Sequence, residues 1–246
     1  MRTYIKKFNT YEEYSAFVNS SGFVTPNVST YEIESGETEV RFNKTKPDIE
    51  ITHEYVDLGL PSGTLWATEN IKDENGNDLY FAWGEAQGYT SGQVGTVKNF
   101  SFEDYEFGTS DNLTKYNSTD GKTALDSEDD AAAANWGSGW KMPTKEQFEE
   151  LTANTTTAWT QVNGVNGVLF TSKVNNNTLF FPAVGEATEG NIGNIGDFSF
   201  YMSVSLSDYD IKFSYVLFII SGFCEITDSD SGRQFGDPVR PVKAQD

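Results

Sequence analysis

The stretch Gly139-Trp140-Lys141-Met142-Pro143-Thr144-Lys145-Glu146-Gln147-Phe148-Glu149-Glu150-Leu151 gives the clearest indication of how this chain folds. It predicts a helix that begins after Thr144, whose hydroxyl can cap the first turn. Gln147 stands three residues later, which is the spacing of a capping box. Phe148 and Leu151 supply the buried stripe of the same helix. We therefore expect an amphipathic helix that packs against a core through these two side chains.

On both sides of this helix the sequence predicts short strands between glycine and asparagine turns. Residues 57–67 form a strand, a turn and a second strand, and residues 78–83 form another strand. Asn75-Gly76 suits a hairpin turn better than a calcium loop, because the twelfth position of such a loop should be Glu and is Gly84. Further strands are expected at residues 158–162, 167–172 and 178–182.

Residues 84–130 form a long polar segment rich in Gly, Ser, Thr and Asn. Loops of this length are usually functional or inserted. A short helix follows at residues 131–136. Acidic side chains precede that helix, and we interpret them as helix caps and a solvated face in preference to ligands of a hard cation: Asp126, Glu128, Asp129 and Asp130.

The first part of the chain, residues 1–50, has the pattern of a separate small module. A capped helix is expected at residues 10–18, followed by a hairpin of strands at 28–33 and 38–42. We expect this α/β-hairpin module to attach the main domain, residues 51–246, to a particle or to form a homo-oligomer.

The composition indicates a folded chain and excludes several classes of function. Of 246 residues, 37% are hydrophobic and 14% aromatic, which is enough for a sizeable core. A formal net charge of −20, with no basic stripe, argues against binding to nucleic acids or to anionic membranes. No apolar run is long enough to cross a membrane, and the N-terminal sequence does not have the pattern of a Sec signal peptide.

The chemically reactive residues are few. The chain has a single cysteine, Cys224, and a single histidine, His53, so an internal disulfide and a Cys/His zinc site are both excluded. We expect His53 to lie at the surface and Cys224 to be a small buried apolar residue. No phosphate-binding loop is present, and no pair of carboxylates stands out as a catalytic acid and base.

Four blocks of the sequence line up, in order, with one family: residues 58–67, residues 80–85, residues 129–144, and residues 180–185 together with the terminal stretch 238–242. The chain resembles the C-type-lectin-fold proteins of gut Bacteroidetes and their phages, which are related to the Fibrobacter major paralogous domain and more distantly to the formylglycine-generating-enzyme fold. Some members of this group are variable proteins of diversity-generating retroelements. The resemblance covers about residues 55–246.

The resemblance implies an α+β domain with a twisted antiparallel sheet, flanking helices and long loops. Retroelement-diversified members vary just before the Val-Arg-Pro-Val ending, which corresponds here to residues 198–234. Formylglycine-generating enzymes use a pair of cysteines with copper, and this chain has one cysteine. The Glu-Pro-Asn, Gln-Pro-Asp and Trp-Asn-Asp motifs of calcium-dependent lectins are absent. We therefore predict no enzymatic activity, no catalytic residue, no metal and no cofactor.

Within the variable stretch, residues 211–220 are predicted to form a strand with two different faces. Phe213, Tyr215, Leu217 and Ile219 form the ordinary core face. The other face begins polar at Lys212 and Ser214 and ends apolar at Val216, Phe218 and Ile220. One interpretation is a central strand buried on both sides. The other is a display face on which Val216, Phe218, Ile220 and Phe223 form an exposed apolar patch that binds a partner.

The predicted binding surface combines aromatic anchors with a polar rim. The anchors are Tyr201, Tyr209, Phe218 and Phe223. The full set of predicted ligand-binding residues is Tyr201, Met202, Asp208, Tyr209, Asp210, Lys212, Ser214, Val216, Phe218, Ile220, Phe223, Glu225, Asp228, Asp230 and Gln234.

Three functions from different classes follow from this interpretation. The first is a ligand-recognition protein that binds a protein or glycan receptor on a cell surface, located on a phage virion or outside the cell. The second is a structural protein of a virion or surface assembly that uses the fold as a rigid spacer. The third is an enzyme of the formylglycine-generating-enzyme fold. A template repeat matching residues 198–242 beside a reverse transcriptase gene would select the first.

Overall fold

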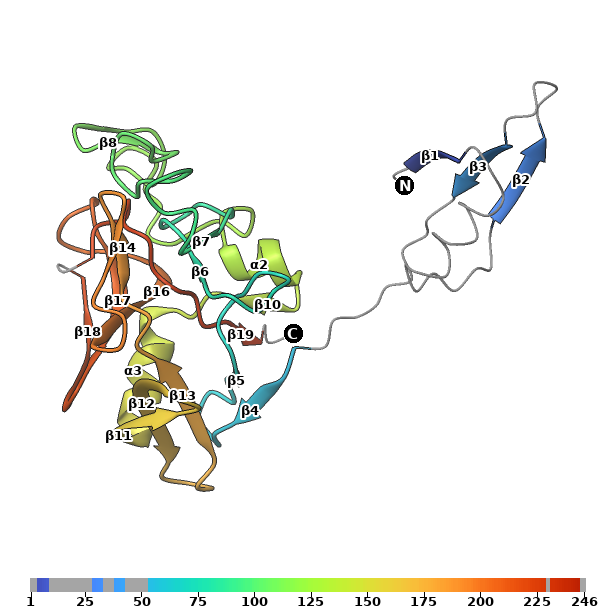
Figure 1. Cartoon of the computed structure of the whole chain (residues 1–246). Helices are drawn as coiled ribbons and strands as arrows, with labels where there is room; N and C mark the ends of the chain where they lie inside the picture. The colour runs from blue at the N-terminus through green and yellow to red at the C-terminus, as the bar shows by residue number, and fades with distance from the viewer. Residues whose placement is uncertain (1–3, 9–27, 33–37, 43–52, 229–230, 244–246) are drawn as a thin grey trace. The chain divides into compact units, whose positions relative to one another are not determined.

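The computed structural model divides the chain into two compact units, Met1–Thr52 and His53–Asp246 (Figure 1). In the first unit it describes the backbone of residues 4–8, 28–32 and 38–42, and in the second it describes residues 53–228 and 231–243. The division lies close to the boundary after residue 50 that the sequence indicates.

The described part of the first unit is an antiparallel sheet in the order β1-β3-β2, formed by β1 (Tyr4–Phe8), β2 (Val28–Glu32) and β3 (Thr38–Phe42). Strands β2 and β3 pair with Val28 opposite Phe42, which confirms the predicted hairpin. Strand β1 pairs with the other side of β3 and was not expected from the sequence. The helix predicted at residues 10–18 lies outside the described residues.

The second unit is rich in β-structure, and its described residues contain two α-helices, α2 (Ala131–Trp136) and α3 (Lys145–Asn154). A four-stranded sheet in the order β10-β19-β5-β4 joins the two ends of the unit, because Val242 of β19 pairs with Trp66 of β5. Its strands are β4 (Tyr55–Asp57), β5 (Leu65–Ala67), β10 (Trp140–Lys141) and β19 (Val242–Lys243).

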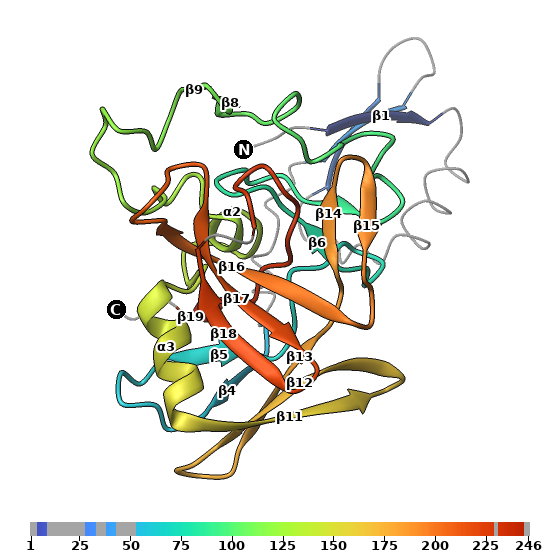
Figure 2. The ribbon, with the colours of Figure 1, turned by 90° about the vertical axis from the view of Figure 1, so that its left-hand side faces the viewer.

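Two three-stranded antiparallel sheets make up most of the remaining β-structure (Figure 2). The first contains β11 (Thr155–Val162), β12 (Val165–Ser172) and β13 (Thr178–Pro182). The second contains β16 (Phe198–Leu206), β17 (Ser214–Ile220) and β18 (Phe223–Thr227). Helix α3 contacts β11 and all three strands of the second sheet. Three small ladders complete the unit: β6 (Leu79–Tyr80) with β7 (Tyr89–Thr90), β8 (Gly108–Thr109) with β9 (Asn112–Leu113), and β14 (Glu186–Thr188) with β15 (Asn191–Gly193).

Both helices begin at the caps that the sequence predicts. The Thr144 hydroxyl accepts a hydrogen bond from Gln147 N, and Gln147 Oε1 accepts one from Thr144 N, so the capping box is formed. Asp130 caps α2, because its carboxylate accepts hydrogen bonds from the backbone N–H groups of Ala132, Ala133 and Met142. Asp130 thus acts as a helix cap, as predicted from the sequence.

The core consists of two hydrophobic clusters. One lies beneath α3, where Phe148 and Leu151 pack with Trp66, Phe181 and Tyr201. The other contains Trp83, Phe100, Tyr116, Met142 and Val239, so it takes side chains from the long polar segment and from the C-terminal stretch. Phe148 and Leu151 are buried as predicted. The segment 84–130 is therefore a folded part of the domain whose aromatic residues help to form its core.

Candidate functional site

The sheet β16-β17-β18 has one face in the core and one face that is partly open. On the inner face, Tyr201, Leu217 and Ile219 belong to the cluster beneath α3, and Cys224 and Ile226 pack against it. Side chains alternate along each strand, so residues at the intervening positions point to the opposite side. That outer side is where the sequence placed the display surface.

The outer side of the sheet carries an apolar group that we call the aromatic face: Phe198, Phe200, Phe218, Ile220 and Phe223. Register brings these residues together, since Phe200 lies opposite Phe218, and Ile220 lies opposite both Phe198 and Phe223. The ring centroids of Phe200 and Phe218 are 4.8 Å apart and stacked, and Phe198 and Phe223 meet Phe218 at 5.8 and 6.3 Å. None of these residues belongs to either core cluster.

The aromatic face is open to solvent at one end. Phe223 is 49% exposed, Phe198, Phe218 and Ile220 are half-buried, and Phe200 is buried beneath its neighbours. Neither interpretation of the strand is therefore right along its whole length. Strand β17 is a central strand, as the first interpretation expects, and its last two outward side chains form a partly exposed patch, as the second expects.

Three members of the aromatic face, Phe218, Ile220 and Phe223, are predicted from the sequence, whereas Phe198 and Phe200 of β16 are not. The signal for them is the alternation of Phe198, Phe200 and Met202 with the inward residues of the same strand. Pairing with β17 places the two phenylalanines beside Phe218. This pairing cannot be deduced from the sequence of either strand alone.

Five residues predicted for the surface are buried, and the prediction is wrong for them: Tyr201, Met202, Ser214, Val216 and Gln234. Tyr201 faces the core, and its hydroxyl donates to the carbonyl oxygen of Pro182 at 2.6 Å. Met202 lies opposite Val216 on the outer side of the sheet, but there the second core cluster and the C-terminal segment cover it. The backbone N–H of Met202 donates to the carbonyl oxygen of Pro238 at 3.3 Å, which shows how closely that segment runs.

The predicted strand at 211–220 begins later than expected, because residues 207–213 form a turn before β17. Ser207 Oγ accepts hydrogen bonds from the N–H groups of Tyr209 and Asp210, and it donates to Asp228 Oδ2. The turn exposes Asp208, Asp210 and Tyr209, and Tyr209 is 90% exposed. This acidic turn, residues 207–213, therefore presents one aromatic ring and two carboxylates to solvent.

The remaining predicted polar residues have mixed environments. Glu225 is exposed and lies opposite Phe218, so it borders the aromatic face directly. Lys212 and Asp228 are half-buried. Asp230 lies outside the described residues. Of the exposed carboxylates, Glu225 borders the aromatic face, whereas Asp208 and Asp210 lie in the acidic turn, which precedes the other end of β17.

A buried arginine fixes the segment that follows β18. Arg233 Nε donates to the Tyr105 hydroxyl, and its terminal nitrogens donate to the carbonyl oxygens of Lys115, Tyr116 and Ile211. The guanidinium also lies 4.8 Å from the centroid of the Trp83 ring. These bonds hold the C-terminal segment to the long polar segment and to the acidic turn, and they therefore fix the position of that turn.

An open cavity of about 470 Å³ lies between the start of β11 and the turn that joins β17 to β18. Its lining includes Thr155, Thr157, Phe223 and Cys224. Burial raises the pKa of the Cys224 thiol to about 12, so the thiol stays protonated at neutral pH. The cavity adds a polar recess next to Phe223.

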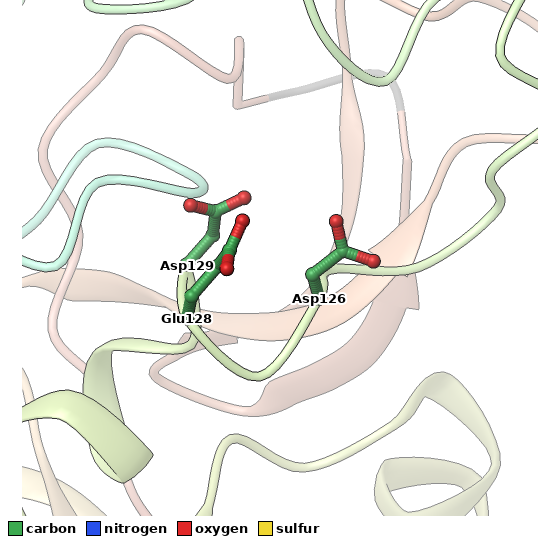
Figure 3. Close-up of side chains that lie close together, drawn as sticks. All are labelled: Asp126, Glu128 and Asp129. Atoms are coloured by element: carbon green, nitrogen blue, oxygen red, sulfur yellow. The ribbon is translucent and has the colours of Figure 1, made fainter.

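The acidic side chains of Asp126, Glu128 and Asp129 lie close together before α2 (Figure 3). Lys115 Nζ lies 3.4, 3.1 and 2.5 Å from carboxylate oxygens of Asp126, Glu128 and Asp129, and Lys122 pairs with Asp126. An ammonium group thus occupies the place that a cation would take. This arrangement agrees with the preferred interpretation of these residues as a solvated acidic face.

Two other features of the sequence have structural roles. Asp73 Oδ1 accepts hydrogen bonds from the backbone N–H groups of Asn75 and Asn77, and the backbones of Lys72 and Asp78 form an antiparallel β-bridge. The stretch around Asn75-Gly76 is therefore a hairpin turn, as the sequence predicts. His53 stacks on Trp136 with ring centroids 3.5 Å apart, and burial lowers its pKa.

Among the described residues, none of the helices combines the length and apolar character that crossing a membrane requires. No family model, curated protein or solved structure matches this chain.

Proposed function

We propose that the second unit is a ligand-recognition domain that binds a protein receptor on a cell surface through the aromatic face. The observation that carries this proposal is the exposed end of the aromatic face, where Phe218, Ile220 and Phe223 remain in contact with water. Buried aromatic anchors dominate the binding energy of protein interfaces, and a polar rim surrounds them. A receptor with an apolar patch and a basic group opposite Glu225 would complement this surface.

The C-type lectin fold is part of the same proposal. Its support is the resemblance of the four sequence blocks, together with the positions of their residues in the fold. Trp66, Trp83, Met142 and Val239 lie in the two core clusters. The pairing of Val242 with Trp66 brings the two ends of the unit together. The blocks therefore correspond to the rigid frame, and the less conspicuous sequence between them forms the surface.

Diversification of the exposed residues is the further step of this proposal, with the protein acting on a phage particle or at the surface of a cell. A rigid frame with a partly exposed, side-chain-tolerant surface is what a variable binding protein needs. The structure sharpens the expectation about where variation can occur. Positions 209, 210, 218, 220, 223 and 225 can change without opening the core, whereas 201, 214, 216 and 234 cannot.

Sequencing several copies of the gene tests the diversification directly. We expect substitutions to concentrate at the exposed positions, beside a reverse transcriptase gene and a template repeat that covers residues 198–242. Variation spread equally over Tyr201, Val216 and the exposed positions would contradict the proposal. An unchanging stretch, together with tight assembly into a particle, would favour a structural protein instead.

A binding experiment tests recognition itself. The fluorescently labelled full chain is incubated with a panel of intact gut Bacteroidetes cells, with and without protease treatment of the cells. We expect saturable, protease-sensitive binding to some strains, which Phe218→Ser/Phe223→Ser weakens at least about tenfold, since two anchors are lost. The matched control is Val97→Ser/Val174→Ser, which removes two exposed apolar side chains outside the aromatic face. Equal loss in both double variants would contradict the proposal.

A further inference from the structure

Strand β11 is an open edge of the sheet β11-β12-β13. It pairs with β12 without interruption, from Thr155 opposite Ser172 to Val162 opposite Val165. Among the described residues, no strand pairs with its other side. An uncovered edge strand offers a row of backbone donors and acceptors to another chain. Strand β11 is therefore a candidate interaction surface that is separate from the aromatic face.

The backbone groups on the outer side of β11 can be assigned from its hairpin. The turn Asn163-Gly164 has positive φ at both residues, 51° and 84°, which is typical of a two-residue hairpin turn. The two valines that close this turn are a hydrogen-bonded pair, and such pairs alternate with non-hydrogen-bonded pairs along an antiparallel ladder. Thr157, Trp159 and Gln161 therefore direct their backbone N–H and C=O groups away from β12. Within the described ranges, no backbone–backbone hydrogen bond uses these groups.

Other edge strands of the second unit are covered or protected by their sequence. The backbone of β16 is bonded to other segments near both of its ends, through Gly185 and Pro143. Strand β13 ends in Pro182, and β18 carries Glu225. Proline and charged side chains are common means of preventing edge strands from pairing. Strand β11, with the sequence TTTAWTQV and eight residues, has neither a proline nor a charge, and its register has no bulge.

The sheet β11-β12-β13 is uncharged although the chain is strongly acidic. Charged residues make up 22% of the sequence, whose formal net charge is −20, and these three strands contain none. This net charge makes two copies of the chain repel each other, and the repulsion is weakest where neutral strands meet. The outward side chains beside the edge are partly apolar, since exposed Ala158 lies opposite half-buried Leu169. Leu169 in turn lies opposite half-buried Phe180, and neither of these two belongs to a core cluster.

We propose that β11 pairs antiparallel with β11 of a second copy of this chain, so that two three-stranded sheets become one six-stranded sheet. A strand that pairs antiparallel with itself forms a two-fold interface, which closes at two copies. With Ala158 on the two-fold axis, the outward backbone groups of Thr157 meet those of Trp159 in the other copy. The two alanines then occupy a non-hydrogen-bonded position, where side chains approach most closely and a small residue fits. The open cavity beside Thr155 and Thr157 leaves room at that end of the strand.

This homodimer goes beyond the proposed receptor binding and uses a different surface. It would carry two aromatic faces, so a receptor present in many copies on one cell would be bound more tightly than by a single chain. The alternative occupant of the same edge is an extended segment of another protein, which would add a strand to the sheet. That alternative leaves the isolated chain monomeric, whereas the homodimer forms without any other component.

The test is sedimentation-velocity ultracentrifugation of the full chain over a range of concentrations. We expect a monomer–dimer equilibrium. Ala158→Glu should raise the Kd of the dimer at least tenfold, because it places two carboxylates opposite each other across the axis. The matched control is Val97→Glu, which adds the same charge in the long polar segment, at a side chain that is 65% exposed, and should leave the Kd unchanged. Both positions are exposed, so both variants should keep the Tm of the wild type.

A cross-linking experiment tests the pairing itself. In a Cys224→Ser background, Ala158→Cys should form a disulfide-linked dimer under mild oxidation, because facing residues of a non-hydrogen-bonded pair lie within the range that a disulfide spans. Val97→Cys in the same background is the control and should cross-link far more slowly.

The proposal is overturned if the wild-type chain stays monomeric at every concentration, or if Ala158→Glu dimerises as the wild type does. It is equally overturned if Val97→Glu loses the dimer to the same extent, or if Ala158→Cys cross-links no faster than Val97→Cys. The receptor-binding experiment does not enter these tests, so the failure of either proposal can be recognised separately.

Discussion

Phe200 and Phe218 stack across strands β16 and β17 with their ring centroids 4.8 Å apart and their planes 25° from parallel. This pair forms the base on which Phe198, Ile220 and Phe223 lie, on the side of the sheet away from α3. Phe200 is buried and Phe223 is about half exposed. Phe200 therefore contributes to the packing of the sheet, whereas Phe223 is accessible to a binding partner. The two ends of the same face should respond differently to substitution.

The first prediction concerns that gradient. Phe223→Ser should lower the free energy of unfolding by less than about 1 kcal/mol, because the side chain is largely surrounded by water in the free chain. Val216→Ser should lower it by about 2–4 kcal/mol, because it leaves a cavity and buries a hydroxyl. Urea unfolding of the two variants and the wild type measures both values. Equal losses would show that the open end of the sheet is as tightly packed as the closed end.

The second prediction concerns the buried arginine. Arg233→Lys should destabilise the domain by about 3 kcal/mol or more, because one ammonium group cannot reach the four acceptors that the guanidinium now binds. Arg240→Lys is a matched comparison, since Arg240 is also fully buried and binds Asn70 Oδ1 and the carbonyl oxygen of Ala67. Denaturant midpoints give the two losses. A stability change within about 0.5 kcal/mol for Arg233→Lys would contradict the role assigned to this side chain.

The third prediction concerns a buried ion pair in the long polar segment. Lys98 Nζ lies 2.8 Å from Glu85 Oε2, and both side chains are buried. Lys98→Met should cost about 3–5 kcal/mol, since it leaves the Glu85 carboxylate buried without its cation. Adding Glu85→Gln to Lys98→Met should restore part of this loss. A double-mutant cycle in urea measures the coupling, and additive losses would indicate that the two charges do not interact.

The fourth prediction concerns pH. Burial raises the pKa of Asp237 above its unfolded value, so the folded state binds this proton more tightly than the unfolded chain does. The resulting stabilisation is complete below about pH 4, the unfolded pKa, and is lost as the pH rises through the folded pKa. The wild-type chain should therefore lose more stability between pH 5 and pH 8 than Asp237→Asn does. Identical pH profiles would show that Asp237 titrates normally.

Much of the local structure could be predicted from the sequence because short-range bonds decide it. The capping box of Thr144 and Gln147 and the cap at Asp130 involve residues within a few positions of one another. The turn around Asp73 follows from hydrogen bonds to its own neighbours. In each of these places the residues that determine the conformation are adjacent in the chain.

Which outward side chains of β17 meet water was decided by the tertiary structure alone. Val216 and Phe218 are two positions apart on the same face and are both apolar, so their alternation cannot distinguish them. Val216 is buried and lies opposite Met202, which packs in the second core cluster, whereas Phe218 lies opposite Phe200, which belongs to neither core cluster. Burial depends on which distant segment packs over a strand, while caps and turns depend on bonds between neighbours. For this reason the sequence determined the elements and the limits of the candidate surface, and only the fold determined which of its residues a ligand can reach.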